Sequence, residues 1–280
     1  MFDTILFSSD VFDNKKVDAD LESEYIAAQK AGFKTILFSY TSWFEDGKIK
    51  LNINPEETMN VIYRGWMMTV DTYQLFCLAL MEKRIHLINE AKEYENCHYF
   101  PNSYRAFGND TARVLLFPLH QRIDVEEVGK HFTRFMVKDY VKSVKGSIFP
   151  KYFDLSIRQS EFDYWMDEFY KFRGDLISGG ICIKEYLDLK KYEDSTNECR
   201  VFYFNHKVMF MEQDENKPSV PESMINKYNS LDSNFYTVDY AELSDGTWKV
   251  IECGDGQVSG ILKENNVESF YSNLFRLTRE

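Results

Sequence analysis

The sequence predicts an α/β domain in residues 1–100 and a second block of helices and strands in residues 101–280. Three observations carry this prediction. Before residue 100, short apolar runs alternate with stretches of helical period, which is typical of βαβ units. Around residues 101–103 the pattern loosens, and after residue 180 apolar strands follow one another and end in a hairpin. We therefore place a domain boundary near residue 101.

The N-terminal block has the signature of a largely parallel sheet. Its helical stretches include one that closes at Gly32 and one for which Thr69 is a suitable N-cap. The predicted strands are residues 4–7, 34–38 and 60–64, and a short apolar stretch follows at residues 85–88. The predicted helices are residues 19–31 and 70–84. Open α/β sheets expose ligand-binding groups at their strand ends, and the polar residues at the predicted strand ends are Ser8, Ser9, Asp10 and Arg64.

The second block begins with an apolar run and an amphipathic stretch and then becomes rich in strands. A turn at Asp245-Gly246 joins its last two strands into a hairpin, and a helix closes the chain. The predicted elements are residues 113–117, 124–135, 135–140, 160–172, 180–188, 199–204, 207–212, 235–242, 247–253 and 267–276.

Composition and charge restrict the classes of function. The chain has 280 residues, of which 44% are hydrophobic, and this is enough for one large core or two modest ones. Its net charge of -12 would repel a phosphate backbone, which argues against nucleic acid as a partner. The N-terminal residues carry no basic segment, and no apolar run approaches the roughly 20 residues of a membrane span, so we expect a cytoplasmic protein.

Several common catalytic and metal-binding motifs are missing. No phosphate-loop, dinucleotide-binding, zinc-protease or serine-hydrolase motif occurs. The five cysteines are scattered without a C-x-x-C pair, which predicts buried thiols and not a disulfide framework or a zinc site.

Acidic residues in the last hairpin are the most informative feature. With Asp245-Gly246 as the turn, Asp239 and Glu252 lie at similar distances from it on neighbouring strands, so both carboxylates can project onto one face. Asp255 follows, and we expect it in a glycine-flanked loop. Three such side chains suit Mg²⁺, which prefers a few carboxylates together with water and substrate phosphates. The alternative is a hairpin with solvated acids, but apolar neighbours would make unpaired carboxylates costly there.

Basic residues at strand ends supply candidate phosphate contacts. Lys138 ends an apolar strand, and Lys142 and Lys145 follow in the next loop. A lysine at a strand end can act as a point charge on a phosphate. Lys184 lies in a later strand that turns polar at its end, and Arg200 starts the next one. Three lysines in a loop are more often solvated, but the strand position of Lys138 limits its access to water.

Four short motifs, in this order, resemble the ATP-grasp superfamily, in particular the clade named for one arginine and two lysines. The motifs are residues 63–67, 138–143, 198–202 and 252–260. The resemblance implies an α/β N-terminal (pre-ATP-grasp) domain followed by an α+β two-lobed ATP-grasp domain. It also implies ATP, Mg²⁺ and the ligation of a carboxylate to an amine, thiol or hydroxyl through an acylphosphate.

The resemblance also implies roles for individual residues. Lys138, Lys142 and Arg200 match phosphate-side positions, and Asp239 and Glu252 match metal carboxylates, with Asp255 as a third candidate. Arg64 is the candidate for holding the substrate carboxylate or acylphosphate. The adenine-facing hinge would be Lys184, Glu185, Tyr186 and Leu187, with Asp188 toward the ribose. The sequence departs from the family pattern at Gly254, where an asparagine usually follows the glutamate, and Asp255 is a candidate replacement.

We therefore expect a carboxylate-amine ligase with small-molecule or peptide substrates. The resemblance to the clade also implies a peptide or a protein as the molecule that is modified. Two alternatives stay open. One is a nucleotidyl- or phosphoryl-transferring enzyme that uses the same ATP pocket, and the other is a nucleotide-binding module without catalysis. The sequence does not encode the acid, the acceptor, the number of metal ions or the oligomeric state.

Overall fold

The N-terminal part is built on a four-stranded parallel sheet in the order β2-β1-β3-β4. The structure is a computed structural model that describes residues 2–144 and 146–280. The strands are β1 (Thr4–Ser8), β2 (Lys34–Phe38), β3 (Met59–Arg64) and β4 (Ile85–Leu87). The predicted strands and their parallel arrangement are confirmed.

Helices cover both faces of this sheet, because strand residues alternate between its two sides. Ile5 and Phe7 face α1, whereas Leu6 faces α3. The helices are α1 (Glu22–Ala31), preceded by the 3₁₀ turn Ala19–Leu21, then α2 (Tyr40–Phe44) and α3 (Val70–Met81). Thr69 caps α3 as predicted, but the helix ends three residues before residue 84. Helix α2 was not predicted.

Two helices connect the N-terminal sheet to the rest of the chain, where the sequence suggested a loosened pattern. They are α4 (Ala91–His98) and α5 (Phe100–Phe107), and the 3₁₀ turn Gly108–Asp110 follows. Residues 101–103, where the sequence pattern loosens, lie within α5. Pro101 lies in the first turn of α5, where a proline removes no helical hydrogen bond. The boundary near residue 101 stays a prediction.

The middle lobe is an antiparallel sheet in the order β5-β8-β6-β7, with helices on one face. Its elements are β5 (Val114–Phe117), α6 (Val125–Gly129), β6 (Arg134–Asp139), β7 (Phe153–Asp154), α7 (Gln159–Arg173), the 3₁₀ turn Gly174–Leu176 and β8 (Ile181–Glu185). Phe135, Val137 and Ile183 pack against Phe162 and Phe169 of α7. The opposite face carries Lys138 and Lys184 and lines the cavity described below.

The C-terminal lobe is a second antiparallel sheet in the order β12-β11-β13-β14. Its main elements are β11 (Glu198–Phe204), β12 (Lys207–Glu212), α8 (Glu222–Lys227), β13 (Phe235–Glu242) and β14 (Trp248–Asp255), and the short strands Lys191–Tyr192 and Ser195–Thr196 precede them. One face packs on α4, α5 and α8. Gly246 adopts a φ of +85° in the predicted turn, which a glycine accommodates without strain.

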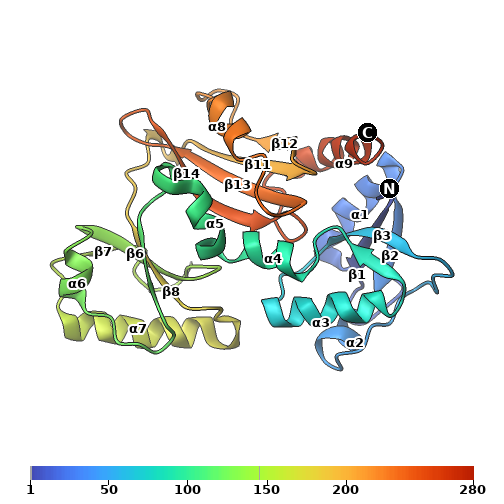
Figure 1. The fold of residues 1–280 in the computed structure, drawn as a ribbon, viewed down its shortest axis with the longest axis horizontal. Coiled ribbons are helices and arrows are strands. Elements are labelled where there is room, and N and C mark those ends of the chain that lie inside the picture. The colour runs from blue at the N-terminus through green and yellow to red at the C-terminus, as the bar shows by residue number, and fades with distance from the viewer. Residues whose placement is uncertain (1, 145) are drawn as a thin grey trace.

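The chain closes with α9 (Val267–Leu277), which follows the 3₁₀ turn Glu264–Asn266 and returns to the N-terminal sheet. Figure 1 shows α9 beside α1, so the two ends of the chain meet. Phe270 and Leu274 of α9 share one core with Ile5 of β1 and Phe202 of β11. In the described residues, no helix is long and apolar enough to cross a membrane.

Candidate active site

A cavity of about 1080 Å³ lies between the middle and C-terminal lobes. Its walls come from the face of the middle sheet that carries Lys138 and Lys184, from the face of the C-terminal sheet that carries Arg200 and Asp239, and from the loop after β6. The N-terminal part contributes Met67 and His98. This volume is at the upper end of the range for small-molecule sites.

A row of four charged side chains crosses the C-terminal sheet, and three of them, Arg200, Asp239 and Glu252, line this cavity. Glu212, Arg200, Asp239 and Glu252 are successive register partners on β12, β11, β13 and β14. The prediction that Asp239 and Glu252 project onto one face is therefore confirmed. Arg200 binds Asp239 through two hydrogen bonds of 2.8 and 2.7 Å. Burial raises the pKa of Asp239, and this guanidinium opposes the shift.

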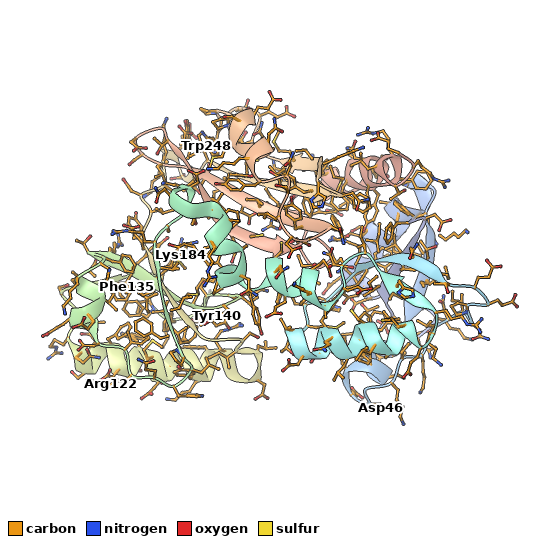
Figure 2. All side chains as sticks on the ribbon, viewed as in Figure 1. Asp46, Arg122, Phe135, Tyr140, Lys184 and Trp248 are labelled. Carbon is orange, nitrogen blue, oxygen red and sulfur yellow. The ribbon has the colours of Figure 1, made fainter. Side chains whose placement is uncertain are left out.

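Two lysines of the middle lobe reach across the cavity. Lys138 on β6 donates to Oε1 of Glu252 at 2.9 Å. Lys184 on β8 donates to the carbonyl of Ile251, the residue at which β14 is bulged. The ring of Phe100 lies 5.1 Å from the ammonium of Lys138 and 4.5 Å from that of Lys184. Figure 2 shows Lys184 between the middle lobe and α5.

The cations in the cavity shift one another's pKa values. Burial and then the charge of Lys138 lower the pKa of Lys184 to about 8. Burial acts in the same direction on Lys138, but the Glu252 carboxylate outweighs it and raises the pKa of Lys138 above its usual value. Burial, Lys142 and Lys138 lower the pKa of His98 to about 3, so its ring is neutral at neutral pH.

Asp255 does not join the other two acids. It is the last residue of β14 and not part of a loop, and it faces the opposite side of the sheet because strand residues alternate. Its carboxylate accepts hydrogen bonds from Asn89 Nδ2 at 2.5 Å and from the Gln257 backbone at 2.8 Å, and burial raises its pKa to about 7. Within residues 2–144 and 146–280, no three His, Cys, Asp or Glu side chains form a group that could hold a metal ion.

Gly254 lies on the same face of the sheet as Glu252, opposite Thr237. A Cβ at Gly254 would stand 3.0 Å from the Ser259 hydroxyl and 3.1 Å from the Thr237 hydroxyl. These two hydroxyls contact each other at 2.9 Å. They fill the space next to Glu252 that a larger residue at this position would take.

The residues of the predicted hinge do not share one environment in the structure. The carboxylate of Glu185 is held by Arg113 at 2.6 and 3.0 Å, which lowers its pKa. Leu187 lines the cavity, and neither its N–H nor its C=O has a hydrogen-bond partner among the described residues. Lys184 lies in the cavity close to Lys138.

Tyr186 of the predicted hinge and Asp188, the predicted ribose contact, lie away from the cavity. Tyr186 packs against Tyr152 and under the guanidinium of Arg134, and Asp188 is exposed. Neither lines the cavity. Strand β8 ends at Glu185, so the chain has already turned at these positions.

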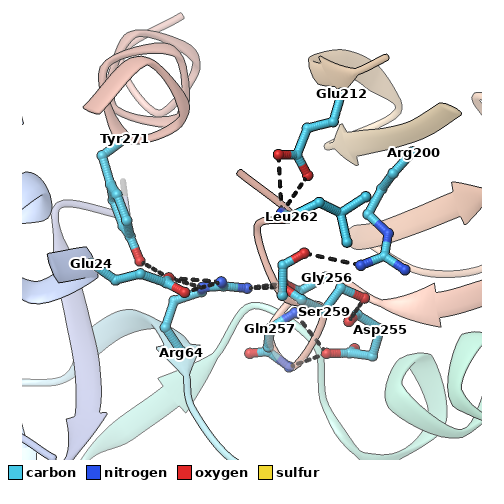
Figure 3. Close-up of polar contacts among 11 residues, drawn as sticks. Glu24, Arg64, Arg200, Glu212, Asp255, Gly256, Gln257, Ser259, Leu262 and Tyr271 are labelled. Atoms are coloured by element: carbon cyan, nitrogen blue, oxygen red, sulfur yellow. Dashed lines mark hydrogen bonds and ion pairs between the residues drawn. The ribbon is translucent and has the colours of Figure 1, made fainter. Parts of the chain in front are cut away.

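Arg64 is buried and fully bonded, which corrects its predicted role in substrate binding. Figure 3 shows Nε and Nη2 on the carboxylate of Glu24, at 2.7 to 3.0 Å, while Nη1 donates to the carbonyls of Gly256 and Ser259. Tyr271 of α9 also donates to Glu24, at 2.5 Å. Every N–H of the guanidinium therefore donates a hydrogen bond to Glu24, Gly256 or Ser259. Arg64 therefore joins the N-terminal sheet to the loop after β14.

Lys142 is exposed and lines the cavity in the loop after β6, and Lys145 of the same loop lies outside the described residues. The sequence analysis missed His98 and Phe100. Both belong to helices of the connecting segment, and only their aromatic character in an amphipathic stretch marked them. Nothing local indicated that they would meet Lys138.

The fold and the cavity define the class of protein. A family model for the ATP-grasp domain, described as family 3 of the clade named for one arginine and two lysines, matches residues 127–274, more than half of the chain. The chain therefore belongs to this clade of the ATP-grasp superfamily, and the predicted family and fold class are confirmed. No curated protein sequence matches it.

Solved structures of ATP-grasp proteins resemble the whole chain. The ATP-grasp ligase PsnB complexed with a minimal precursor aligns with a TM-score of 0.62 and 11% identity, covering 99% of this chain and 97% of that one. D-cycloserine synthetase DcsG gives 0.64 and 12%, with 98% and 99% covered. D-alanine–D-alanine ligase from Bacillus anthracis complexed with ATP gives 0.59 and 12%, with 99% and 95% covered. At such identities the similarity concerns the fold.

Arg64→Met should be strongly destabilising, because it leaves the carboxylate of Glu24 buried without its partner. We expect the free energy of unfolding to fall by about 3–5 kcal/mol. A matched control is Lys30→Met, which breaks the exposed pair between Lys30 of α1, the helix that also carries Glu24, and Glu268 of α9. That change should leave the free energy of unfolding nearly unchanged, because exposed ion pairs contribute little. Urea unfolding followed by circular dichroism measures both, and equal effects would contradict the structural role of Arg64.

Proposed function

We propose that this protein is an ATP- and Mg²⁺-dependent ligase that joins a carboxylate to an amine and releases ADP. One observation carries the proposal. Within a chain of the ATP-grasp superfamily, two carboxylates and three cations converge in the cavity between the lobes: Asp239, Glu252, Lys138, Lys184 and Arg200.

The cavity offers groups for each part of a nucleotide. The backbone N–H and C=O of Leu187, which have no partner in the described part of the chain, would bind the base as a donor and an acceptor. Lys138, Lys184 and Arg200 would contact the phosphates, and Lys142 in the adjoining loop would add a fourth cation. Solved relatives complexed with ATP, or with Mg and ADP, support this assignment.

Asp239 and Glu252 fit a magnesium ion. They are register partners on one sheet face, and their side chains are 17% and 41% exposed to the cavity. Mg²⁺ is commonly bound by one or two carboxylates together with substrate phosphates and water, so a pair of acids on this face is compatible with it. When bound, the ion supplies positive charge that stabilises the transferring phosphoryl group.

The proposed reaction has two steps. A substrate carboxylate oxygen attacks the γ-phosphorus and ADP leaves, which gives an acylphosphate. An amine nitrogen then attacks the acyl carbon, phosphate leaves, and the amine loses a proton to form the amide. Lys138, Lys184 and Arg200 would hold the phosphate charge throughout, and the lobes would exclude water.

Peptide or amino-acid substrates are the favoured class. The PsnB structures contain a precursor peptide, and D-alanine–D-alanine ligase is named for an amino-acid pair. Transfer of a nucleotidyl or phosphoryl group to a hydroxyl, and nucleotide binding without catalysis, are the alternatives. The released products distinguish them, because ligation through an acylphosphate gives ADP and inorganic phosphate, phosphoryl transfer to a hydroxyl gives ADP without inorganic phosphate, and nucleotidyl transfer gives pyrophosphate.

We expect ADP to form when the protein meets ATP, Mg²⁺ and a pooled mixture of amino acids and peptides. Glu252→Gln should lower this rate by about a hundredfold, because it removes a carboxylate needed at the transferring phosphate. Asp245→Asn, in the exposed turn of the same hairpin, should leave the rate unchanged. Chromatography that resolves ADP from AMP is the measurement. AMP as the product, or no difference between these two variants, would overturn the proposal.

Nucleotide affinity should fall as the pH rises, because Lys184 has a pKa of about 8 and must be charged to bind phosphate. We expect the affinity for AMPPNP, a non-hydrolysable ATP analogue, to drop by up to about tenfold per pH unit above about pH 8. Calorimetric titrations between about pH 7 and pH 9 would measure this dependence. Lys184→Met should remove it. Lys138→Met should move it to higher pH, because the Lys138 charge lowers the pKa of Lys184. A flat wild-type profile would contradict the role of Lys184.

A further inference from the structure

The carboxylates proposed for the metal are paired, in this structure, with the cations proposed for the phosphates. Lys138 lies 2.9 Å from Glu252, and Arg200 lies 2.7 Å from Asp239. Both ion pairs line the cavity. The same four groups therefore satisfy one another in this structure and would have to part when nucleotide and metal bind.

Burial makes an uncompensated charge in either pair costly. The side chain of Lys138 is 4% exposed, and those of Arg200 and Asp239 are 19% and 17% exposed. A charge with so little access to water is destabilising unless another charge or strong hydrogen bonds replace its partner. A ligand that attracts only the cations would leave the buried carboxylate of Asp239 without its partner, and one that attracts only the carboxylates would leave Lys138 and Arg200 without theirs.

We propose that nucleotide and divalent cation bind by exchanging these two ion pairs, so that each ligand raises the affinity for the other. The polyphosphate forms ion pairs with Lys138 and Arg200, and the divalent cation binds the carboxylates of Glu252 and Asp239, so every charge keeps a partner. Because the coupling is thermodynamic, it is reciprocal: the factor by which metal raises nucleotide affinity equals the factor by which nucleotide raises metal affinity. This inference rests on the proposed nucleotide site.

The buried pair of Arg64 and Glu24 has a different character. Arg64 also bonds two backbone carbonyls, and neither Arg64 nor Glu24 lines the cavity. That pair is structural. The cavity pairs differ because a ligand can reach both partners, which is the condition for exchange.

The inference makes an unusual prediction for Glu252→Gln. Removing this metal ligand frees Lys138, so AMPPNP should bind the variant in EDTA about three- to tenfold more tightly than it binds the wild type. The wild type should gain about tenfold or more on addition of Mg²⁺, and the variant should gain much less. Isothermal titration calorimetry of AMPPNP with EDTA and with Mg²⁺ measures all four affinities.

A matched control separates release of the lysine from the loss of a negative charge. Glu198→Gln removes the same charge from the same cavity, but Glu198 is exposed and forms no ion pair within the described residues. Its metal-free affinity should rise less than that of Glu252→Gln. In a Lys138→Met background, Glu252→Gln should bring no larger gain than Glu198→Gln does, and this non-additivity is the signature of the exchange.

The outcomes are distinct. If AMPPNP binds none of the folded variants in either condition, the proposed nucleotide site fails and the exchange fails with it. If AMPPNP binds, but Glu252→Gln weakens its metal-free binding or matches Glu198→Gln, the exchange alone is overturned. Thermal melts by circular dichroism confirm that each variant is folded.

Discussion

The ion pair between Lys138 and Glu252 joins the middle lobe to the C-terminal lobe, and the geometry of the cavity depends on it. The neighbouring bond from Lys184 to the Ile251 carbonyl strengthens the same link, and the ring of Phe100 supports both ammonium groups. Both contacts cross the cavity from the middle sheet to β14 of the C-terminal sheet. The carboxylates and lysines are thereby held where one ligand can reach them together.

This concentration of charge explains how a chain of net charge -12 can offer a site for a polyphosphate. Among the residues that the structure describes, the cations that line the cavity are Lys138, Lys142, Lys151, Arg173, Lys184 and Arg200. Acids offset them, including Glu252 and Asp239, so the cavity is close to neutral before it binds anything. A divalent cation that occupies the acids would leave the lysines and arginines to the phosphates. Local pairing, and not net charge, decides what this cavity attracts.

Arg64 and Arg200 show why a residue type at a strand end does not define its role. Both bind a carboxylate through two nitrogens and also contact backbone carbonyls of the loop after β14. Arg64 lies where the N-terminal sheet, α9 and this loop meet, and no N–H remains for a substrate. Arg200 lines the cavity, next to groups that could exchange partners. The two arginines hold one loop from opposite sides, so the wall of the cavity is fixed by contacts with both parts of the chain.

The sequence by itself determined the strands, most of the long helices and the meeting of Asp239 with Glu252, because hydrophobic period and turn chemistry are local and set register across a hairpin. It also placed Lys138 and Arg200 at strand ends. Only the tertiary structure decided that Lys184 lies beside Lys138, that His98 reaches the cavity, that Phe100 packs against both lysines, that Asp255 turns away and that Arg64 is fully bonded. These outcomes depend on how separate sheets pack face to face, and the packing brings together residues that are far apart in the chain and carry no local signal of their partners.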